Sequence, residues 1–169
     1  MNELAKRVLI TISIIAIQIA IDYFFNFGFY VIASIIPIII INLPYKTPTP
    51  VALVIAFLVG VSIDLLSNTP VGLCTASLLL ATLFRRVSIK LFIGKESLDK
   101  NERMLNSNII PLETIAIITF SINFIYILTY IFLENFSFAP IQFNLLRLII
   151  SVTINSGITM LYYFITNKG

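Results

Sequence analysis

The sequence predicts an all-α, polytopic membrane protein, in which residues 1–169 form a single bundle of about six transmembrane helices with both termini in the cytoplasm. Two features of composition support this fold class. Apolar residues make up 59% of the chain and charged residues only 11%, whereas a soluble domain carries roughly 25% charged residues. The mean hydropathy is high, at +1.02. The third observation is the recurrence of apolar runs close to the length of about 20 residues that crosses a hydrocarbon layer roughly 30 Å thick.

Polar residues and prolines divide the apolar runs into the expected spans. These spans lie at about 8–24, 27–43, 51–66, 71–84, 110–133 and 141–165. The first two form an antiparallel pair. A loop from Pro44 to Pro50 follows them, since proline lacks an amide donor and disfavours helix in the residue before it. The third and fourth spans form a hairpin, because Thr69 can cap a helix and Pro70 suits its first position.

The distribution of basic residues predicts the orientation. Nine of the 19 charged residues gather between 85 and 108, which we expect to be a cytoplasmic loop. With the N-terminus in the cytoplasm, Lys6, Arg7, Lys46, this loop and Lys168 lie inside, and the outer connections hold no lysine or arginine, as the positive-inside rule requires. The first span begins like a signal peptide, but no small-residue cleavage site follows it. We therefore expect an uncleaved anchor and a multi-pass protein of the inner membrane.

Two opposite charges fall inside the expected spans. Charges within a membrane are costly and usually face a bundle interior, a cavity or a partner. Asp64 lies near the outer end of the third span, and Arg147 lies at a similar depth in the last span. We predict that Asp64 and Arg147 form an intramembrane pair in which each offsets the burial cost of the other. The alternative is that Arg147 snorkels to the outer headgroups along its aliphatic stem.

Small residues recur along one face of the third span and on the fourth. Ala56, Gly60 and Asp64 are four residues apart and therefore share a helical face, and Gly72 and Ala76 show the same interval. Small residues let membrane helices approach closely. The candidate helix-packing or partner face comprises Ala56, Gly60, Pro70, Gly72 and Ala76. This face either joins the two helices internally or receives the membrane helix of a partner, and both alternatives remain open.

The last two spans carry uncharged polar residues. Arg147, Ser151 and Asn155 recur at four-residue intervals on an otherwise apolar helix, so this stripe should not face lipid. Asn123 lies near the middle of the preceding span. We predict that Asn123, Ser151 and Asn155 make interhelical polar contacts, each contributing about 1 kcal/mol or less.

Several classes of function lack the residues they need. The chain has no histidine and a single cysteine, Cys74, so no disulfide within the chain and no cysteine-based metal site is possible. No nucleophile with a base, no paired carboxylates and no phosphate-binding glycine loop occurs. We expect no enzyme, no catalytic, cofactor-binding or metal-binding residues, and no nucleic-acid partner. The charged cluster mixes both signs, as solvated loops do, and contact with anionic membrane lipid is the functional alternative.

The stretch AFLVGVSIDLLSNTPVGLCTASLLLATLFRR, residues 56–86, resembles the rod shape-determining protein MreD family. In that family a Phe-Leu-x-Gly run leads to Asp-Leu-Leu, a short polar turn and Pro-x-Gly. The matching residues here are Phe57, Leu58, Gly60, Asp64, Leu65, Leu66, Pro70 and Gly72. The chain length, the layout of spans, and Asn155 followed by an apolar aromatic end are also similar to the family. Val71 stands where the family more commonly has leucine.

The resemblance implies a non-enzymatic scaffold of the bacterial cell-elongation (rod-shape) machinery in the cytoplasmic (inner) membrane. Such a scaffold associates with an MreC-like protein, and thereby indirectly with MreB and the peptidoglycan synthase, to control cell shape. It needs no cofactor, and its other partner is membrane lipid. The alternative is a substrate-binding membrane subunit of an energy-coupling-factor vitamin transporter, to which the family is similar in fold. Such subunits hold their ligand on the outer side, where the connections around Asp22, Asn68 and Glu134 are brief.

Overall fold

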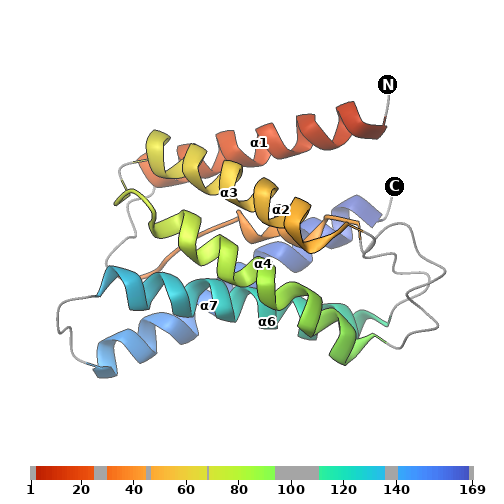
Figure 1. The fold of residues 1–169 in the computed structure, drawn as a ribbon. Coiled ribbons are helices and arrows are strands. Elements are labelled where there is room, and N and C mark those ends of the chain that lie inside the picture. The colour runs from red at the N-terminus through yellow and green to blue at the C-terminus, as the bar shows by residue number, and fades with distance from the viewer. Residues whose placement is uncertain are drawn as a thin grey trace.

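The computed structural model describes residues 3–24, 30–44, 47–67, 69–93, 111–135 and 141–167. Helices are the regular secondary structure of these residues, which contain no strand, as the composition predicts. The helices are α1 (Glu3–Phe24), α2 (Pro37–Ile41), α3 (Thr49–Leu66), α4 (Leu73–Phe92), α6 (Leu112–Glu134) and α7 (Ile141–Asn167). The long helices lie side by side, and the start of α1 and the end of α7 lie at the same end of the molecule (Figure 1).

Three helices are long and apolar enough to span a membrane, judged by length and composition. They are α3, α6 and the part of α7 from Gln142 to Thr166. Their outward faces carry large exposed apolar side chains such as Leu58, Phe120 and Leu146. Exposing so much apolar surface to water is unfavourable, whereas exposing it to lipid is not. These helices therefore have the surface expected of membrane spans.

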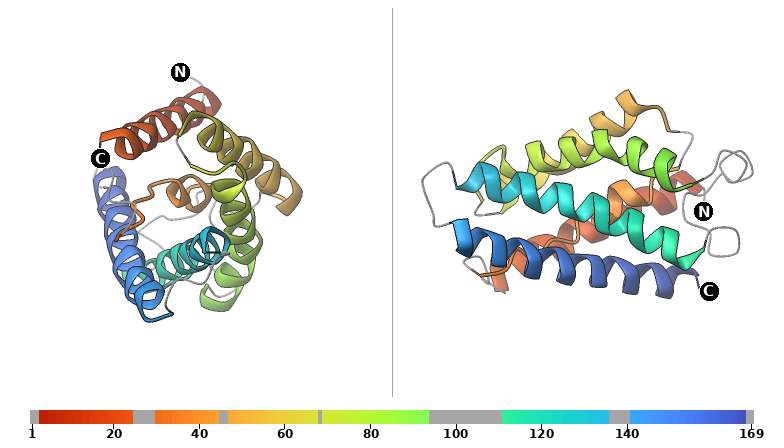
Figure 2. Two further views of the ribbon diagram at one scale, coloured as in Figure 1. Left: turned by 90° about the vertical axis from the view of Figure 1, so that its left-hand side faces the viewer. Right: turned by 90° about the horizontal axis from the view of Figure 1, so that it is seen from below.

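The short helix α2 lies at the centre of the molecule, and the longer helices surround it (Figure 2, left). Around this centre α1 packs on α3, α3 on α4, α4 on α6 and α6 on α7, while α2 contacts α4 and α6. All five residues of α2 are buried. The fully buried isoleucines Ile40, Ile63, Ile118 and Ile122 contribute to one continuous apolar core. Helix α2 is thus part of the interior of the bundle.

The expected regular helix over residues 27–43 is wrong. Residues 31–35, which we call the central segment, have no regular secondary structure, and only Pro37–Ile41 is helical. Residues 27–29 lie outside the described residues. Pro37 occupies the first position of α2 and cannot donate the hydrogen bond that would continue a helix through it. Isoleucine and valine, which dominate this stretch, are also among the weaker helix formers.

The expected loop over residues 85–108 begins too early. Helix α4 continues to Phe92, so Arg85, Arg86 and Lys90 belong to the helix. Arg85 is only 4% exposed, and its guanidinium donates hydrogen bonds to the carbonyl oxygens of Leu43 and Pro44, at 2.5 and 3.1 Å. Because the chain after α2 supplies these acceptors, a charged residue here is compatible with a packed helix. The remaining part of the expected loop, residues 94–108, lies outside the described residues.

Candidate functional site

Asp64 joins α3 to the beginning of α4. Its side chain is 2% exposed, and its carboxylate accepts hydrogen bonds from the backbone amides of Gly72, Cys74 and Thr75, each at 3.0 Å, and from the Thr75 hydroxyl at 2.5 Å. The first amides of a helix have no partner within the helix. A carboxylate also interacts favourably with the positive end of the helix dipole. Asp64 therefore caps α4 from the neighbouring helix, and these bonds offset the cost of burying its charge.

The start of α4 differs from the predicted start. The helix begins at Leu73, so the predictions that Thr69 caps it and that Pro70 occupies its first position are wrong. The Thr69 hydroxyl is buried without a hydrogen-bond partner among the described residues, and Pro70 is exposed. An ionised carboxylate is a stronger acceptor for backbone amides than a hydroxyl, and Asp64 provides one.

Gly72 is required by its backbone conformation. It precedes α4 with φ of 95°, in the left-handed region, which costs glycine little and other residues more. A Cβ atom at this position would meet nothing within 4 Å. Gly72 thus turns the chain so that its amide and those of the first turn of α4 point toward Asp64, and its small size is not used for helix packing.

Gly60 is the point of closest approach between α3 and α4. A Cβ atom on Gly60 would lie 2.5 Å from the Thr75 Cα and 3.0 Å from its hydroxyl oxygen, so the two helices touch there with no room for a side chain. Ala56, one turn earlier, is fully buried, and Ala76 is half-buried. The same residue, Thr75, therefore contacts Gly60 and donates to Asp64. We call this unit of α3, the turn and α4 the α3–α4 hairpin, residues 49–92.

The predicted pair of Asp64 and Arg147 is wrong. Arg147 forms its salt bridge with Glu134, at 2.5 Å, and the side chains of the two residues are 6% and 31% exposed. Glu134 ends α6 and Arg147 lies in the second turn of α7, so the short connection between these helices brings the charges together. Asp64 instead meets the free amides of α4, which are its nearest donors. Burial of Arg147 also excludes the alternative that it extends away from the protein.

Ser151 and Asn155 bond the central segment to α7. The Ile32 amide donates to the Ser151 hydroxyl at 2.9 Å. The Asn155 side chain accepts from the Ser34 amide at 3.0 Å and donates to the Ile32 carbonyl at 2.9 Å. Both side chains are fully buried. The polar stripe of α7 therefore faces the interior. There Ser151 and Asn155 bond backbone groups of the central segment, which would bond one another if that segment were helical.

Gln18 bonds the same segment to α1, a role that the sequence interpretation missed. Its side-chain oxygen accepts from the Ile35 amide at 2.8 Å, and its nitrogen donates to the Ala33 carbonyl at 3.2 Å and to Asp22 at 2.8 Å. Asp22 in turn accepts from the Ser67 hydroxyl at 2.9 Å. Gln18 and Asp22 are four residues apart in an apolar run, so they share a face of α1. That spacing was the available signal for an inward-facing polar pair.

Asn123 links α6 to α7. Its side-chain nitrogen donates to the Thr119 carbonyl of its own helix at 3.0 Å and, at 3.4 Å, to the Thr159 hydroxyl of α7. One turn further along α6, the hydroxyl of buried Tyr126 accepts from the Ser34 hydroxyl at 3.2 Å. All the predicted interhelical polar residues thus lie in the interior, although only Ser151 and Asn155 bind the same segment.

The chemistry available in this site is hydrogen bonding to backbone. Asp22, Asp64, Gln18 and Asn155 are already bonded to amides, carbonyls or hydroxyls of the chain, whereas the side-chain oxygen of Asn123 is buried without a partner among the described residues. Among the described residues no group of three or more histidine, cysteine, aspartate or glutamate side chains could hold a metal ion. The arrangement is therefore suited to fixing the relative positions of helices.

Removing the Asp64 carboxylate should destabilise the α3–α4 hairpin. The Asp64→Ala variant leaves three amides, two of them buried, and a buried hydroxyl without their acceptor, and we expect it to lower the unfolding free energy by about 3 kcal/mol or more. The matched control is Ser62→Ala on the same helix, whose hydroxyl bonds only the Leu58 carbonyl and should change stability little. Unfolding of the purified protein in mixed detergent micelles measures both. An equal loss in the two variants would refute the cap.

Two glycine substitutions should have opposite effects. Gly60→Ala forces α3 away from Thr75, at an expected cost of about 1 to 3 kcal/mol. Gly157→Ala adds a methyl group where nothing lies within 4 Å and should stabilise α7 by about 0.5 to 1 kcal/mol through helix propensity. Thermal unfolding in detergent gives the sign of each effect. If Gly60→Ala proves neutral, the close approach is absent in solution.

Loss of the Asn155 amide should release the central segment. Asn155→Leu removes the partners of two buried backbone groups, and we expect a cost of about 2 kcal/mol or more. Thr153→Val is the control, since Thr153 is exposed on the same helix and bonds only the Ile149 carbonyl. Hydrogen exchange of the Ser34 amide should also accelerate in the Asn155 variant alone. Unchanged exchange of that amide would contradict the assigned bond.

Comparisons of the chain with protein-family models, with curated proteins and with solved structures find no match. The geometry and the resemblance of residues 56–86 therefore carry the interpretation of function. The structure places the residues of that resemblance in one unit, the α3–α4 hairpin.

Proposed function

We propose that the protein is a non-enzymatic scaffold of the bacterial cell-elongation machinery, a six-pass protein of the cytoplasmic membrane that associates with an MreC-like protein. Through that partner it would act indirectly on MreB and the peptidoglycan synthase. The observation that carries the proposal is the way the residues resembling the MreD family divide between the inside and the outside of the α3–α4 hairpin.

The inward half of these residues builds the hairpin. Gly60 allows the close contact with Thr75, Asp64 caps α4, and Gly72 makes the turn. Each of them has a structural task that a different side chain would not perform. This half accounts for a rigid helix pair without any partner.

The outward half has no such task among the described residues. The exposed fractions of Phe57, Leu58, Leu65 and Leu66 are 51%, 60%, 68% and 54%. Leu58 and Leu65 are seven residues apart and lie on one stripe of α3. We propose that this stripe receives the single membrane-spanning helix of the MreC-like partner. The hairpin would then present a fixed apolar surface whose shape the buried Asp64 maintains.

The membrane orientation is supported by the positions of the chain ends. The start of α1, the end of α7 and the end of α4, which carries exposed Arg86 and Lys90, lie at the same end of the molecule (Figure 1). The positive-inside rule places such an end in the cytoplasm. The opposite end contains the α3–α4 turn, so the partner would reach this turn from the outer leaflet.

Affinity capture from gently solubilised native membranes tests the proposal. The wild type should recover an MreC-like protein and a cell-wall synthase. The double substitution Leu58→Ala and Leu65→Ala should reduce this recovery about tenfold or more, the equivalent of about 1.4 kcal/mol of lost contact. The control pair is Leu145→Ala and Ile149→Ala, which are exposed on α7 and should capture normally.

Two outcomes would contradict the proposal, the first its docking surface and the second its scaffold role. Equal recovery by all variants would exclude the α3 stripe as the docking surface. Recovery of paired ATPases and a coupling membrane subunit would instead make the protein the substrate-binding component of an energy-coupling-factor transporter.

A further inference from the structure

The central segment, residues 31–35, is irregular backbone inside a bundle of apolar helices. Three side chains of two other helices make five hydrogen bonds to its backbone: Gln18 to Ala33 and Ile35, Ser151 to Ile32, and Asn155 to Ile32 and Ser34. Gln18 comes from α1, and the other two come from the polar stripe of α7. The conformation of this segment is therefore held from outside, by side chains far from it in the sequence.

The same residues have a second way to satisfy their backbone, which is an α-helix. In a helix each amide donates to the carbonyl four residues earlier. The Ile35 amide would then donate to the Val31 carbonyl, and the Ile36 amide to the Ile32 carbonyl. In a bilayer a helix is the conformation in which one segment satisfies its backbone by itself. Loss of the side-chain partners therefore favours the helix.

Pro37 opposes this helix but does not forbid it. A helix that ran on into α2 would need an amide at position 37 to donate to the Ala33 carbonyl, and proline has none. In the structure Gln18 donates to that carbonyl at 3.2 Å. Membrane helices tolerate a proline when a neighbouring group satisfies the freed carbonyl, and the Gln18 amide is such a group. Pro37 thus favours the observed conformation, while the side chains of α1 and α7 fix it.

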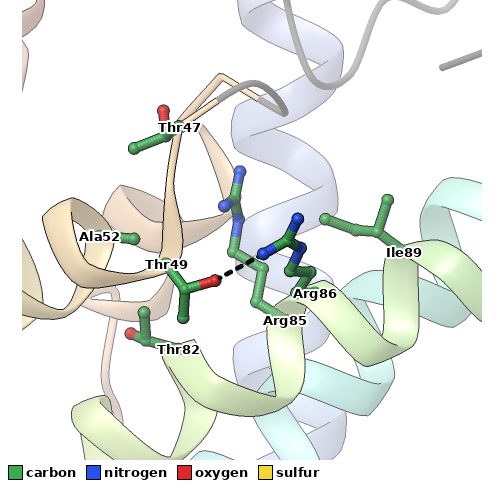
Figure 3. Close-up of a pocket in the computed structure, with 7 residues that line it drawn as sticks. All are labelled: Thr47, Thr49, Ala52, Thr82, Arg85, Arg86 and Ile89. Carbon is green, nitrogen blue, oxygen red and sulfur yellow. Dashed lines mark hydrogen bonds between the residues drawn. The ribbon is translucent and has the colours of Figure 1, made fainter. Parts of the chain in front are cut away.

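A change in the central segment would reach Arg85 of α4. The carbonyl oxygens of Leu43 and Pro44, just after α2, accept hydrogen bonds from its guanidinium at 2.5 and 3.1 Å. Figure 3 shows Arg85 extending from α4 toward the chain that leads into α3, where it lines a small pocket with Thr49. A helix rises about 1.5 Å per residue and an extended chain at most about 3.6 Å, so five converted residues would shorten the chain by up to roughly 10 Å. The bonds of Arg85 to Leu43 and Pro44 would not survive a movement of that size.

We propose that the central segment is a two-state element, which side chains of α1 and α7 hold in its non-helical state. Loss of the bonds from α7 converts residues 31–36 to helix, shortens the chain before α2 and separates Arg85 from the carbonyls that follow α2. The element thereby couples the polar stripe of α7 to the beginning of α3. Such coupling needs an element with two discrete arrangements. The inference depends on a membrane location and does not depend on the scaffold role.

Carbon-13 chemical shifts of the full chain in lipid nanodiscs test the two states. The double substitution Ser151→Ala and Asn155→Leu, the α7 variant, removes the partners that α7 supplies. The shifts of Ile32, Ser34 and Ile35 should change from non-helical in the wild type to helical in the α7 variant. Non-helical shifts at these residues in a folded α7 variant would overturn the proposal.

The matched control is the double substitution Thr153→Val and Thr166→Val on the same helix. Both residues are exposed, and their hydroxyls donate to carbonyls of α7 itself, so the shifts of the central segment should not change. Arg85 gives a second readout. The dipolar contact between its side-chain nitrogens and the Leu43 carbonyl carbon should persist in the control and disappear in the α7 variant. Retention of this contact in the α7 variant would overturn the coupled movement.

A second variant decides the matter if the α7 variant does not fold. Pro37→Ala restores the missing amide donor and should shift the ratio of helical to non-helical segment about a hundredfold toward the helix. It is combined with Asn155→Leu, which leaves Ser151 and Gln18 in place. Helical shifts at the three reporter residues are expected. Non-helical shifts there would show that the segment has a single conformation and would overturn the proposal.

Discussion

The structure depends on one constraint, which is that the buried backbone of the central segment must find hydrogen-bond partners outside itself. A helix bonds its own amides and carbonyls, but residues 31–35 are not helical. Gln18 from α1 and Ser151 and Asn155 from α7 supply the missing partners. A buried amide without a partner costs about 1 to 3 kcal/mol, so these side chains fix where α1 and α7 can lie. Helix α2, too short to be stable alone, is held by the helices that surround it.

The α3–α4 hairpin follows the same principle at another position. The amides at the start of α4 have no acceptors within their own helix, and Asp64 of α3 supplies them. The few polar side chains of an apolar chain are thus used to bond backbone that cannot bond itself. This use explains why polar residues accumulate in the interior while the outer surface is left to leucine, isoleucine, valine and phenylalanine. A rigid interior with an apolar exterior is also what the proposed scaffold needs, since it can bind partners in the membrane without rearranging.

The sequence predicts where the helices lie better than it predicts which groups the polar residues bond. Apolar runs identify α3, α6 and α7 because burial and length leave a strong periodic or continuous signal. The four-residue spacing of Ala56 and Gly60 located the contact between α3 and α4. The same spacing in Ser151 and Asn155 showed which face of α7 avoids lipid. The partners of these residues could not be predicted, because a free amide at a helix start or in an irregular segment has no side-chain signature.

Three errors arose because hydropathy, charge and depth do not show which groups a residue will contact. Hydropathy is equal for an apolar helix and an apolar irregular segment, so residues 27–43 resembled a span although Pro37 divides them. The charge of Arg85 suggested an exposed loop at that residue. Its guanidinium instead donates hydrogen bonds to the carbonyl oxygens of Leu43 and Pro44 within the structure. The pair of Asp64 and Arg147 rests on their similar expected depth in the membrane alone. In the structure Asp64 lies beside the amides of α4, and Arg147 lies beside Glu134.

The most direct test of this account is the backbone conformation of the central segment in a lipid bilayer. Carbon-13 chemical shifts of Ile32, Ser34 and Ile35, measured by nuclear magnetic resonance on labelled protein in lipid nanodiscs, report that conformation residue by residue. The account predicts non-helical shifts at all three residues and helical shifts at Ile39 and Ile40. Helical shifts continuing through residues 31–36 would contradict it, because Gln18, Ser151 and Asn155 would then have no free backbone groups to bind.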